Sequence, residues 1–265
     1  MGSTFDVAPL VHPLESLGLT VEAPLLPGHG TSLADFRRTF FPDWLEAAER
    51  HFDTLAAAHE RVFVGGFSLG GVLALLLGAR RPVAGLFTLA TPMWLYRIFP
   101  WRVRDWRLLV LPVLQYITPV VPMRPRSREA QYIAPGYGYV EGLPLAQLHS
   151  LGRGFALARR ALPAVSAPIL IVQDARDRTI GPDAGEYMAR RVSSSDVTLH
   201  LTHARENITG KHMITTHRET GDEVKDLCIK FVRRLAGKGD CGYSIDTASG
   251  ISIPCGRPQS VKSGM

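Results

Sequence analysis

A serine between two glycines is the residue of this chain best placed to carry out chemistry. Residues 66–70 read Gly-Phe-Ser-Leu-Gly, and they stand between the largely apolar run 61–65 and the leucine-rich stretch 71–77. A Gly-x-Ser-x-Gly segment between a strand and a helix is typical of a sharp turn that exposes the serine hydroxyl. Glycine permits such a turn without Cβ clashes, and free N–H groups at the helix start can bind an oxyanion. We therefore predict that Ser68 is a nucleophile and that the Leu69 N–H binds the oxyanion, with a plain strand-to-helix turn as the alternative.

A serine hydroxyl becomes a good nucleophile only when a base takes its proton, and a basic histidine needs a carboxylate to orient it. Both groups should follow the serine along the chain, in the order serine, acid, histidine, at the ends of later strands. The chain offers two acids after the apolar run 168–172 and three histidines after the run 197–201. The acids are Asp174 and Asp177, and the histidines are His203, His212 and His217. Residue type and order alone do not choose among them.

Strand patterns and helix patterns alternate on both sides of the serine. The apolar runs predict strands over 19–23, 61–65, 83–90, 168–172 and 197–201. Helical spacing of apolar residues predicts helices over 9–17, 42–55, 69–80 and 224–235, with another beginning near 182; Trp44 is expected in the core. Such alternation favours an α/β class with a doubly wound, mostly parallel sheet, whose site lies at the carboxyl ends of the strands. Ser68 and the loops that begin at Asp174 and Thr202 all fall at such ends.

The alternation stops between residues 93 and 162, where seven prolines interrupt short helical patterns. A stretch of this length without strand–helix alternation indicates an inserted helical cap over the sheet. We therefore predict a core made of residues 1–92 and 163–237, with residues 93–162 as the cap. Residues 238–265 are polar and glycine-rich without periodicity, which predicts a disordered or extraneous tail.

Four segments of the chain together resemble a known family. They are residues 21–32 (Val-Glu-Ala-Pro-Leu-Leu-Pro-Gly-His-Gly-Thr-Ser), 66–71, 173–182 and 211–215. In this order they are similar to the bacterial carboxylesterase and monoacylglycerol lipase group of the α/β-hydrolase superfamily, which includes serine aminopeptidase S33-type hydrolases. The resemblance runs from about residue 5 to residue 235.

The resemblance implies an α/β-hydrolase fold and selects among the open candidates. In that family the acid lies shortly before an Ile-x-Pro turn, here 180–182, which points to Asp177 rather than Asp174. The histidine of the family precedes a hydrophobic-Ile-Thr run, which points to His212. His203 stays in reserve, because the loop between it and His212 looks longer than the family's usual loop.

The function that the resemblance implies is hydrolysis of carboxylic esters through an acyl-enzyme. The expected substrates are short- to medium-chain acyl esters or monoacylglycerols, as for a carboxylesterase or lipase. Ser68 would attack the ester, His212 would relay the proton, and Asp177 would orient the imidazole. No cofactor and no metal is implied. A peptidase or amidase on the same fold remains an alternative.

The chain departs from the family pattern near its first residue. The family has a strand ending in His-Gly, and the residue after this pair supplies the second N–H of the oxyanion site. Residues 1–3 align just beyond that motif. We therefore expect this N-terminal strand to be missing, and a truncated, catalytically impaired α/β-hydrolase-like binding protein is the rival interpretation.

The composition and charge of the chain limit the kinds of molecule that it is expected to bind. The 265 residues are 46% hydrophobic, which is typical of a globular chain with one sizeable core. The net charge is +6, and residues 93–128 carry seven arginines against one acid, together with three of the four tryptophans. This pattern favours either peripheral contact with an anionic membrane surface or a solvated rim around an apolar cap. No nucleic-acid-binding motif accompanies it, so we expect a small-molecule ester substrate and no nucleic acid.

Several further features are expected to be structural rather than functional. The three cysteines lack metal-ligand spacing, which favours a reducing compartment, and the first residues lack the basic and apolar segments of a signal peptide. The longest apolar stretch, 108–121, contains two prolines and is too short to span a bilayer. A cytoplasmic location follows as the expectation. His29 is expected to be structural, and His217 to lie exposed on the first turn of the last helix.

Overall fold

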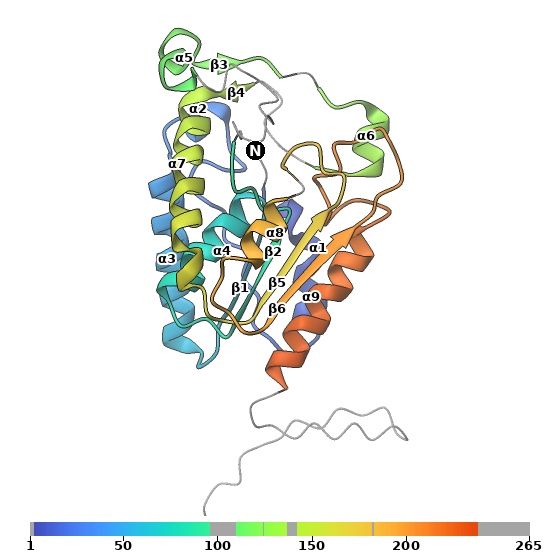
Figure 1. Cartoon of the computed structure of the whole chain (residues 1–265). Coiled ribbons are helices and arrows are strands. Elements are labelled where there is room, and N and C mark those ends of the chain that lie inside the picture. Colours follow the sequence, from blue (N-terminus) through green and yellow to red (C-terminus); the bar gives the residue numbers. More distant parts are fainter. Residues whose placement is uncertain (1–2, 96–109, 124, 137–141, 182, 238–265) are drawn as a thin grey trace, which may run out of the picture.

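Four parallel strands form the main sheet of the computed structural model, which describes residues 3–95, 110–123, 125–136, 142–181 and 183–237 (Figure 1). The strands are β1 (Phe63–Phe67), β2 (Gly85–Leu89), β5 (Ile169–Asp174) and β6 (Val197–Thr202), in this order across the sheet. Each neighbouring pair is parallel. The predicted α/β class with a mostly parallel sheet is confirmed.

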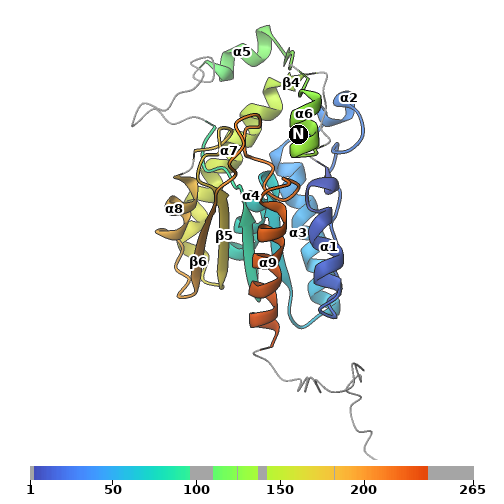
Figure 2. The ribbon, with the colours of Figure 1, turned by 90° about the vertical axis from the view of Figure 1, so that its right-hand side faces the viewer.

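Helices cover both faces of this sheet (Figures 1 and 2). One face carries α1 (Ala8–Glu15) and α9 (Gly221–Ala236), and the other carries α3 (Phe41–Ala58), α4 (Leu69–Arg80), α7 (Leu145–Ala161) and α8 (Ala184–Ala189). Because both faces are covered, every residue of β2 and β5 is buried. This explains why apolar residues run through these strands without polar alternation.

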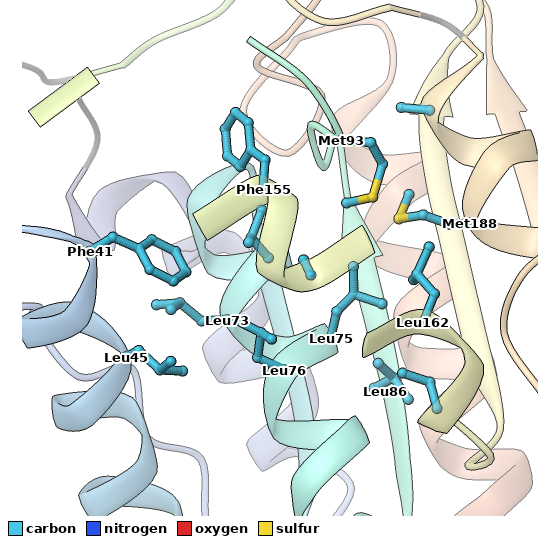
Figure 3. Close-up of a cluster of buried hydrophobic side chains, with 14 of the residues drawn as sticks. Phe41, Leu45, Leu73, Leu75, Leu76, Leu86, Met93, Phe155, Leu162 and Met188 are labelled. Atoms are coloured by element: carbon cyan, nitrogen blue, oxygen red, sulfur yellow. The ribbon is translucent and has the colours of Figure 1, made fainter. Parts of the chain in front are cut away.

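The larger hydrophobic core lies between the sheet and α3, α4 and α7. Figure 3 shows this cluster, in which the leucines of α4 meet Phe41 and Leu45 of α3 and Phe155 of α7. Trp44 is buried as predicted, and its indole N–H donates to the carbonyl oxygen of Pro27 at 3.1 Å. The helix that follows Ser68 is therefore packed into the core along most of its length.

The region predicted as a cap contains short elements above the carboxyl ends of the strands (Figure 1). They are α5 (Leu111–Ile117), β3 (Val120–Val121), α6 (Arg128–Ile133) and β4 (Leu143–Pro144), and β3 pairs with β4 antiparallel. Helix α7, which the sequence placed with the cap, packs against α3 and α4 through Phe155 and Ala158. The remaining short helices are η1 (Thr4–Asp6), α2 (Leu33–Phe36) and η3 (Leu162–Ala164). Trp101, Trp106, five of the seven arginines and the predicted tail 238–265 lie outside the described residues.

One edge of β1 has no partner strand within the described parts of the chain. The Ser68 N–H donates to the Leu89 carbonyl at 2.8 Å, on the side of β2. Since alternate residues of a strand turn their backbone groups to opposite edges, Phe63, Gly65 and Phe67 face the open side. Gly65 is exposed although it lies in the middle of the strand. The sheet thus lacks, among the described residues, the strand that the family resemblance places next to the serine strand.

The prediction of a strand over residues 19–23 is wrong. These residues have no regular secondary structure, although Leu19 and Val21 pack against the core next to α1 and α9. A strand exists only when a neighbour supplies hydrogen-bond partners. Leu19 and Val21 are partly buried, while Thr20 and Glu22 are exposed. The pairing depends on a second segment that the described residues do not supply.

We expect that extending the chain ahead of Met1 by one strand ending in His-Gly will stabilise the protein. The added strand would pair with the edge of β1 that has no partner strand among the described residues, and it would satisfy backbone groups of that edge. Its end could also supply an oxyanion donor, and loss of one such donor typically costs about 10²–10³ in turnover. The measurements are soluble yield, the thermal unfolding temperature and ester hydrolysis. The control is an extension of equal length with prolines at the pairing positions. If the 265-residue chain unfolds at the same temperature and hydrolyses esters as fast as the extended chain, no strand is missing in a functional sense.

Candidate active site

Ser68 occupies a strained turn between β1 and α4. Its backbone has φ +52° and ψ −112°, a conformation that non-glycine residues rarely adopt. Such a residue costs on the order of 1–3 kcal/mol and persists only where its surroundings hold it. Its N–H donates to the Leu89 carbonyl, and its carbonyl accepts from the N–H groups of Gly71 and Val72 at 3.1 and 3.3 Å. The turn therefore fixes the serine backbone from both the sheet and the helix.

Two of the surrounding glycines are required by close packing. A Cβ on Gly66 would lie 2.1 Å from the carbonyl carbon of Gly70, and a Cβ on Gly71 would lie 1.8 Å from the Oγ1 of Thr91. A Cβ on Gly70, by contrast, would meet nothing within 4 Å. The space around the turn thus explains Gly66 and Gly71, but it does not explain Gly70.

The two candidate acids after β5 have different surroundings. Asp174 is fully buried, and its carboxylate accepts from the Arg176 N–H at 2.9 Å, the Thr202 hydroxyl at 3.1 Å and the Ala204 N–H at 2.8 Å. Asp174 therefore ties the loop after β5 to the loop after β6, and both of its oxygens are occupied. It is not directed at a histidine.

One carboxylate oxygen of Asp177 accepts hydrogen bonds from the backbone, and the other contacts His212. Its Oδ1 accepts from the N–H groups of Thr179 and Ile180 at 2.6 and 3.0 Å. Its Oδ2 lies 2.8 Å from His212 Nδ1. The carboxylate is 2% exposed, so the contact is shielded from water.

The imidazole of His212 joins this carboxylate to the serine. Its Nε2 lies 3.1 Å from Ser68 Oγ, and its ring packs 5.1 Å from the ring of Phe67. With Nδ1–H donating to the Asp177 carboxylate, Nε2 is left as the acceptor for the serine hydroxyl. The structure thus brings the three predicted residues together in an order that can move a proton from serine to histidine. Leu69 begins α4, so its N–H is one of the donors that a helix leaves without an intrahelical acceptor.

The other histidines have different positions. His203 is exposed, and the contacts of Asp177 do not include it. The prediction that His217 is exposed is wrong: it is 2% exposed, and its Nε2 lies 3.2 Å from Glu206 Oε1. His29 is buried with its Nδ1 3.2 Å from the Pro27 carbonyl oxygen, and burial lowers its pKa.

Asp6 is a polar residue of this site that the sequence did not reveal. It is 3% exposed, and its Oδ2 accepts from the Ser3 N–H at 3.2 Å. Its Oδ1 has no hydrogen-bond partner among the described residues. Burial raises the pKa of this carboxyl, while the hydrogen bond from the Ser3 N–H acts in the opposite direction. No spacing pattern in the sequence signals this residue.

Within the described residues, no three His, Cys, Asp or Glu side chains gather as a metal site would require. None of the described helices is long and apolar enough to cross a membrane. Of the cap aromatics, Trp94 packs edge-on against Tyr187 with ring centroids 4.5 Å apart, and Tyr116 is exposed.

The fold and the site define the class of protein, and comparison with known proteins agrees. The chain belongs to the α/β-hydrolase family described as serine aminopeptidase, S33 (Hydrolase_4), whose model matches residues 6–206. A thermostable monoacylglycerol lipase of Bacillus sp. (strain H-257) is 26% identical over 198 residues, which cover 74% of each chain. A carboxylesterase of Bacillus subtilis (strain 168) is 26% identical over 235 residues, 88% of this chain and 89% of the relative.

Solved structures show the same fold at lower identity. One, from a study of the metagenome-derived lipolytic enzymes LipS and LipT, has a TM-score of 0.74 at 22% identity and covers 88% of this chain and 89% of its own. The monoacylglycerol lipase of Paleococcus ferrophilus has a TM-score of 0.69 at 17% identity, over 88% of this chain and 91% of its own. The chain is thus an esterase- and lipase-like α/β-hydrolase.

We expect Gly66→Ala to destabilise the protein and Gly70→Ala to leave its stability unchanged. The Gly66 Cβ would press on the backbone of the serine turn, and overpacking of this kind costs typically 1–3 kcal/mol. Gly70→Ala is the matched control, because it adds the same methyl group two residues after Ser68 in open space. Denaturant unfolding gives both values. Equal stabilities for the two variants would mean that the turn is looser than its geometry indicates.

Proposed function

We propose that this chain hydrolyses carboxylic esters through an acyl-enzyme, with Ser68, His212 and Asp177 as a catalytic triad. The observation that carries the proposal is the continuous contact from Ser68 Oγ to His212 Nε2 and from His212 Nδ1 to Asp177 Oδ2. Family membership supports a hydrolase of the esterase and lipase type.

The chemistry proceeds in two balanced halves. Ser68 Oγ attacks the ester carbonyl carbon while His212 Nε2 takes the hydroxyl proton, and Asp177 stabilises the resulting imidazolium. The Leu69 N–H binds the negative oxygen of the tetrahedral intermediate. Collapse breaks the ester C–O bond, and His212 returns its proton to the leaving alcohol. A water molecule then attacks the acyl-enzyme in the same way, which releases the acid and restores Ser68.

A second function on the same site is cleavage of an amide. The family takes its description from a serine aminopeptidase, and the same three residues can attack either carbonyl. A different rival is a protein that binds without turning over substrate, which the open edge of β1 supports. Reaction with a fluorophosphonate separates this rival from both hydrolases, because labelling of Ser68 requires an activated hydroxyl.

A lipid surface is a further proposed contact. Helix α5 lies at the far end of the molecule, beyond the carboxyl ends of the strands (Figure 2). Three of its apolar side chains, Val113, Tyr116 and Ile117, are 64%, 82% and 73% exposed. Together with the arginine-rich sequence 93–128, this apolar face supports peripheral contact with an anionic membrane.

We expect Ser68→Ala, Asp177→Ala and His212→Ala each to lower ester hydrolysis by several orders of magnitude. The three act as a unit, so a double variant should lose little more than a single variant. The measurement is kcat/KM for p-nitrophenyl esters. His203→Ala is the matched control and should retain activity, since His203 is an exposed histidine outside the contact chain. A harmless His212→Ala combined with a lethal His203→Ala would overturn the assignment of the base.

We expect p-nitrophenyl and glycerol esters of short to medium acids to be hydrolysed best. Two relatives that are 26% identical, a monoacylglycerol lipase and a carboxylesterase, support this class of substrate. The apolar and aromatic residues of the cap sequence also support it. The measurement is kcat/KM across an acyl-length series, beside aminoacyl p-nitroanilides of similar size. A clear preference for the anilides would assign the chain to the peptidases instead.

A further inference from the structure

Glu206 lies in the loop between β6 and α9, its side chain is 9% exposed, and the proposed mechanism does not use it. Its Oε2 accepts from the N–H groups of Ile208 and Thr209 at 2.5 and 2.8 Å. Its Oε1 accepts from the Thr209 hydroxyl at 2.5 Å and lies 3.2 Å from His217 Nε2. Burial by itself raises the pKa of this carboxyl, but the hydrogen bonds from Thr209 and His217 hold it well below its usual range. Glu206 is thus an ionised centre around which its own loop folds.

The residue before His212 is tied to this centre. The ammonium of Lys211 is 3% exposed; it donates to the carbonyl oxygen of Glu206 and lies 3.5 Å from its carboxylate. Lys211 has φ +58°, one of only three positive values among the described non-glycine residues. A backbone of this kind is strained and needs surrounding contacts to persist. The buried ammonium and the Lys211 N–H, which donates to the Thr209 hydroxyl at 3.1 Å, are such contacts.

The turn after His212 is tied to the same centre through His217. The His217 N–H donates to the Met213 carbonyl at 3.0 Å, and its carbonyl accepts from the Gly221 N–H at 2.7 Å. Its Nδ1 accepts from the Glu219 N–H at 3.1 Å, so the single ring proton lies on Nε2 and is donated to Glu206. Glu206 therefore holds the chain on both sides of His212.

The loop after β5, which carries Asp177, also contacts the loop that carries His212. The Arg178 N–H donates to the Gly210 carbonyl at 2.8 Å, and its guanidinium donates to the carbonyl of Thr209. Arg178 directly follows Asp177, which would orient the imidazole of His212. Its hydrogen bonds therefore join the loop of Asp177 to the loop of His212. A loop without a strand or helix ladder would otherwise have few contacts to set its position.

We propose that Glu206 is a positioning residue for His212, acting through Lys211 and His217 to hold the imidazole between Asp177 and Ser68. The proposal rests on the triad of the proposed function. His212 must satisfy contacts of 2.8 and 3.1 Å at its two nitrogens at once. A displacement of about 1 Å in such a site can lower the rate about 10²-fold.

The test is Glu206→Gln. Glutamine has the same size, but one side of its amide carries N–H groups instead of an acceptor oxygen. In one orientation these N–H groups face the donors of His217 and Lys211, and in the other they face the backbone N–H groups of the loop, so a hydrogen bond is lost in either case. We expect kcat for p-nitrophenyl butyrate, counted per mole of folded protein, to fall about 10- to 100-fold with KM within about twofold. Glu223→Gln is the matched control and should change neither value, because Glu223 also contacts a histidine (His200 Nε2, 2.6 Å) but does so at the exposed start of α9.

Two further measurements separate positioning from loop stability. His217→Gln can still donate to Glu206 and should retain most of kcat, whereas His217→Leu should behave like Glu206→Gln. The hydrogen-bonded Nδ1 proton of His212 should give a low-field proton resonance that is absent in His212→Ala, lost in Glu206→Gln and kept in Glu223→Gln.

The outcomes that overturn the proposal are distinct from failure of the proposed function. If Glu206→Gln lowers the unfolding temperature but leaves kcat per mole of folded protein and the low-field resonance unchanged, Glu206 only stabilises its loop. If the unsubstituted protein is neither labelled at Ser68 nor hydrolyses esters, the proposed function fails. The resonance then still decides whether Glu206 positions the imidazole.

Discussion

Parallel pairing of β1, β2, β5 and β6 is the constraint on which the rest of the site depends. In a parallel sheet all carboxyl ends lie at one edge, so the loops that leave them are neighbours however far apart they are in sequence. The register aligns Phe67 with Leu89 and Asp174 with Thr202 at this edge. Ser68 follows at once, and the loops after β5 and β6 carry Asp177 and His212 to it. Ser68 and His212, which are 144 positions apart in the sequence, are brought together in this way.

Buried carboxylates hold the loops that the sheet brings together. Asp174 joins the loops after β5 and β6, Asp177 binds two backbone N–H groups of its own turn, and the carboxylate of Glu206 accepts from two backbone N–H groups of its loop. A buried carboxylate without donors is costly, whereas one that accepts several hydrogen bonds can order a segment that has no helix or strand. Asp6 differs from these three, because one of its oxygens has no partner among the described residues.

The open edge of β1 links the stability of the sheet to the geometry of Ser68. The strand that ends directly before Ser68 pairs on one side only within the described residues, and its central Gly65 is exposed. The strain of the Ser68 turn is therefore held by β2, by α4 and by the close contacts of Gly66 and Gly71. Any loosening of β1 acts directly on the geometry of the serine, because no residue separates the end of the strand from the turn.

The amino-acid sequence by itself determined the α/β class, the order of the strands along the chain and the sharp turn at Ser68. These depend on local patterns: apolar runs, helical spacing and the glycines on both sides of the serine. It left two acids and three histidines open, and its resemblance to a known family pointed to Asp177 and His212, which the structure places in contact. Only the tertiary structure decided that residues 19–23 form no strand, that His217 is buried and that Glu206 lies at the centre of its loop. Pairing, burial and the partners of a carboxylate depend on residues distant in sequence, and no local pattern contains that information.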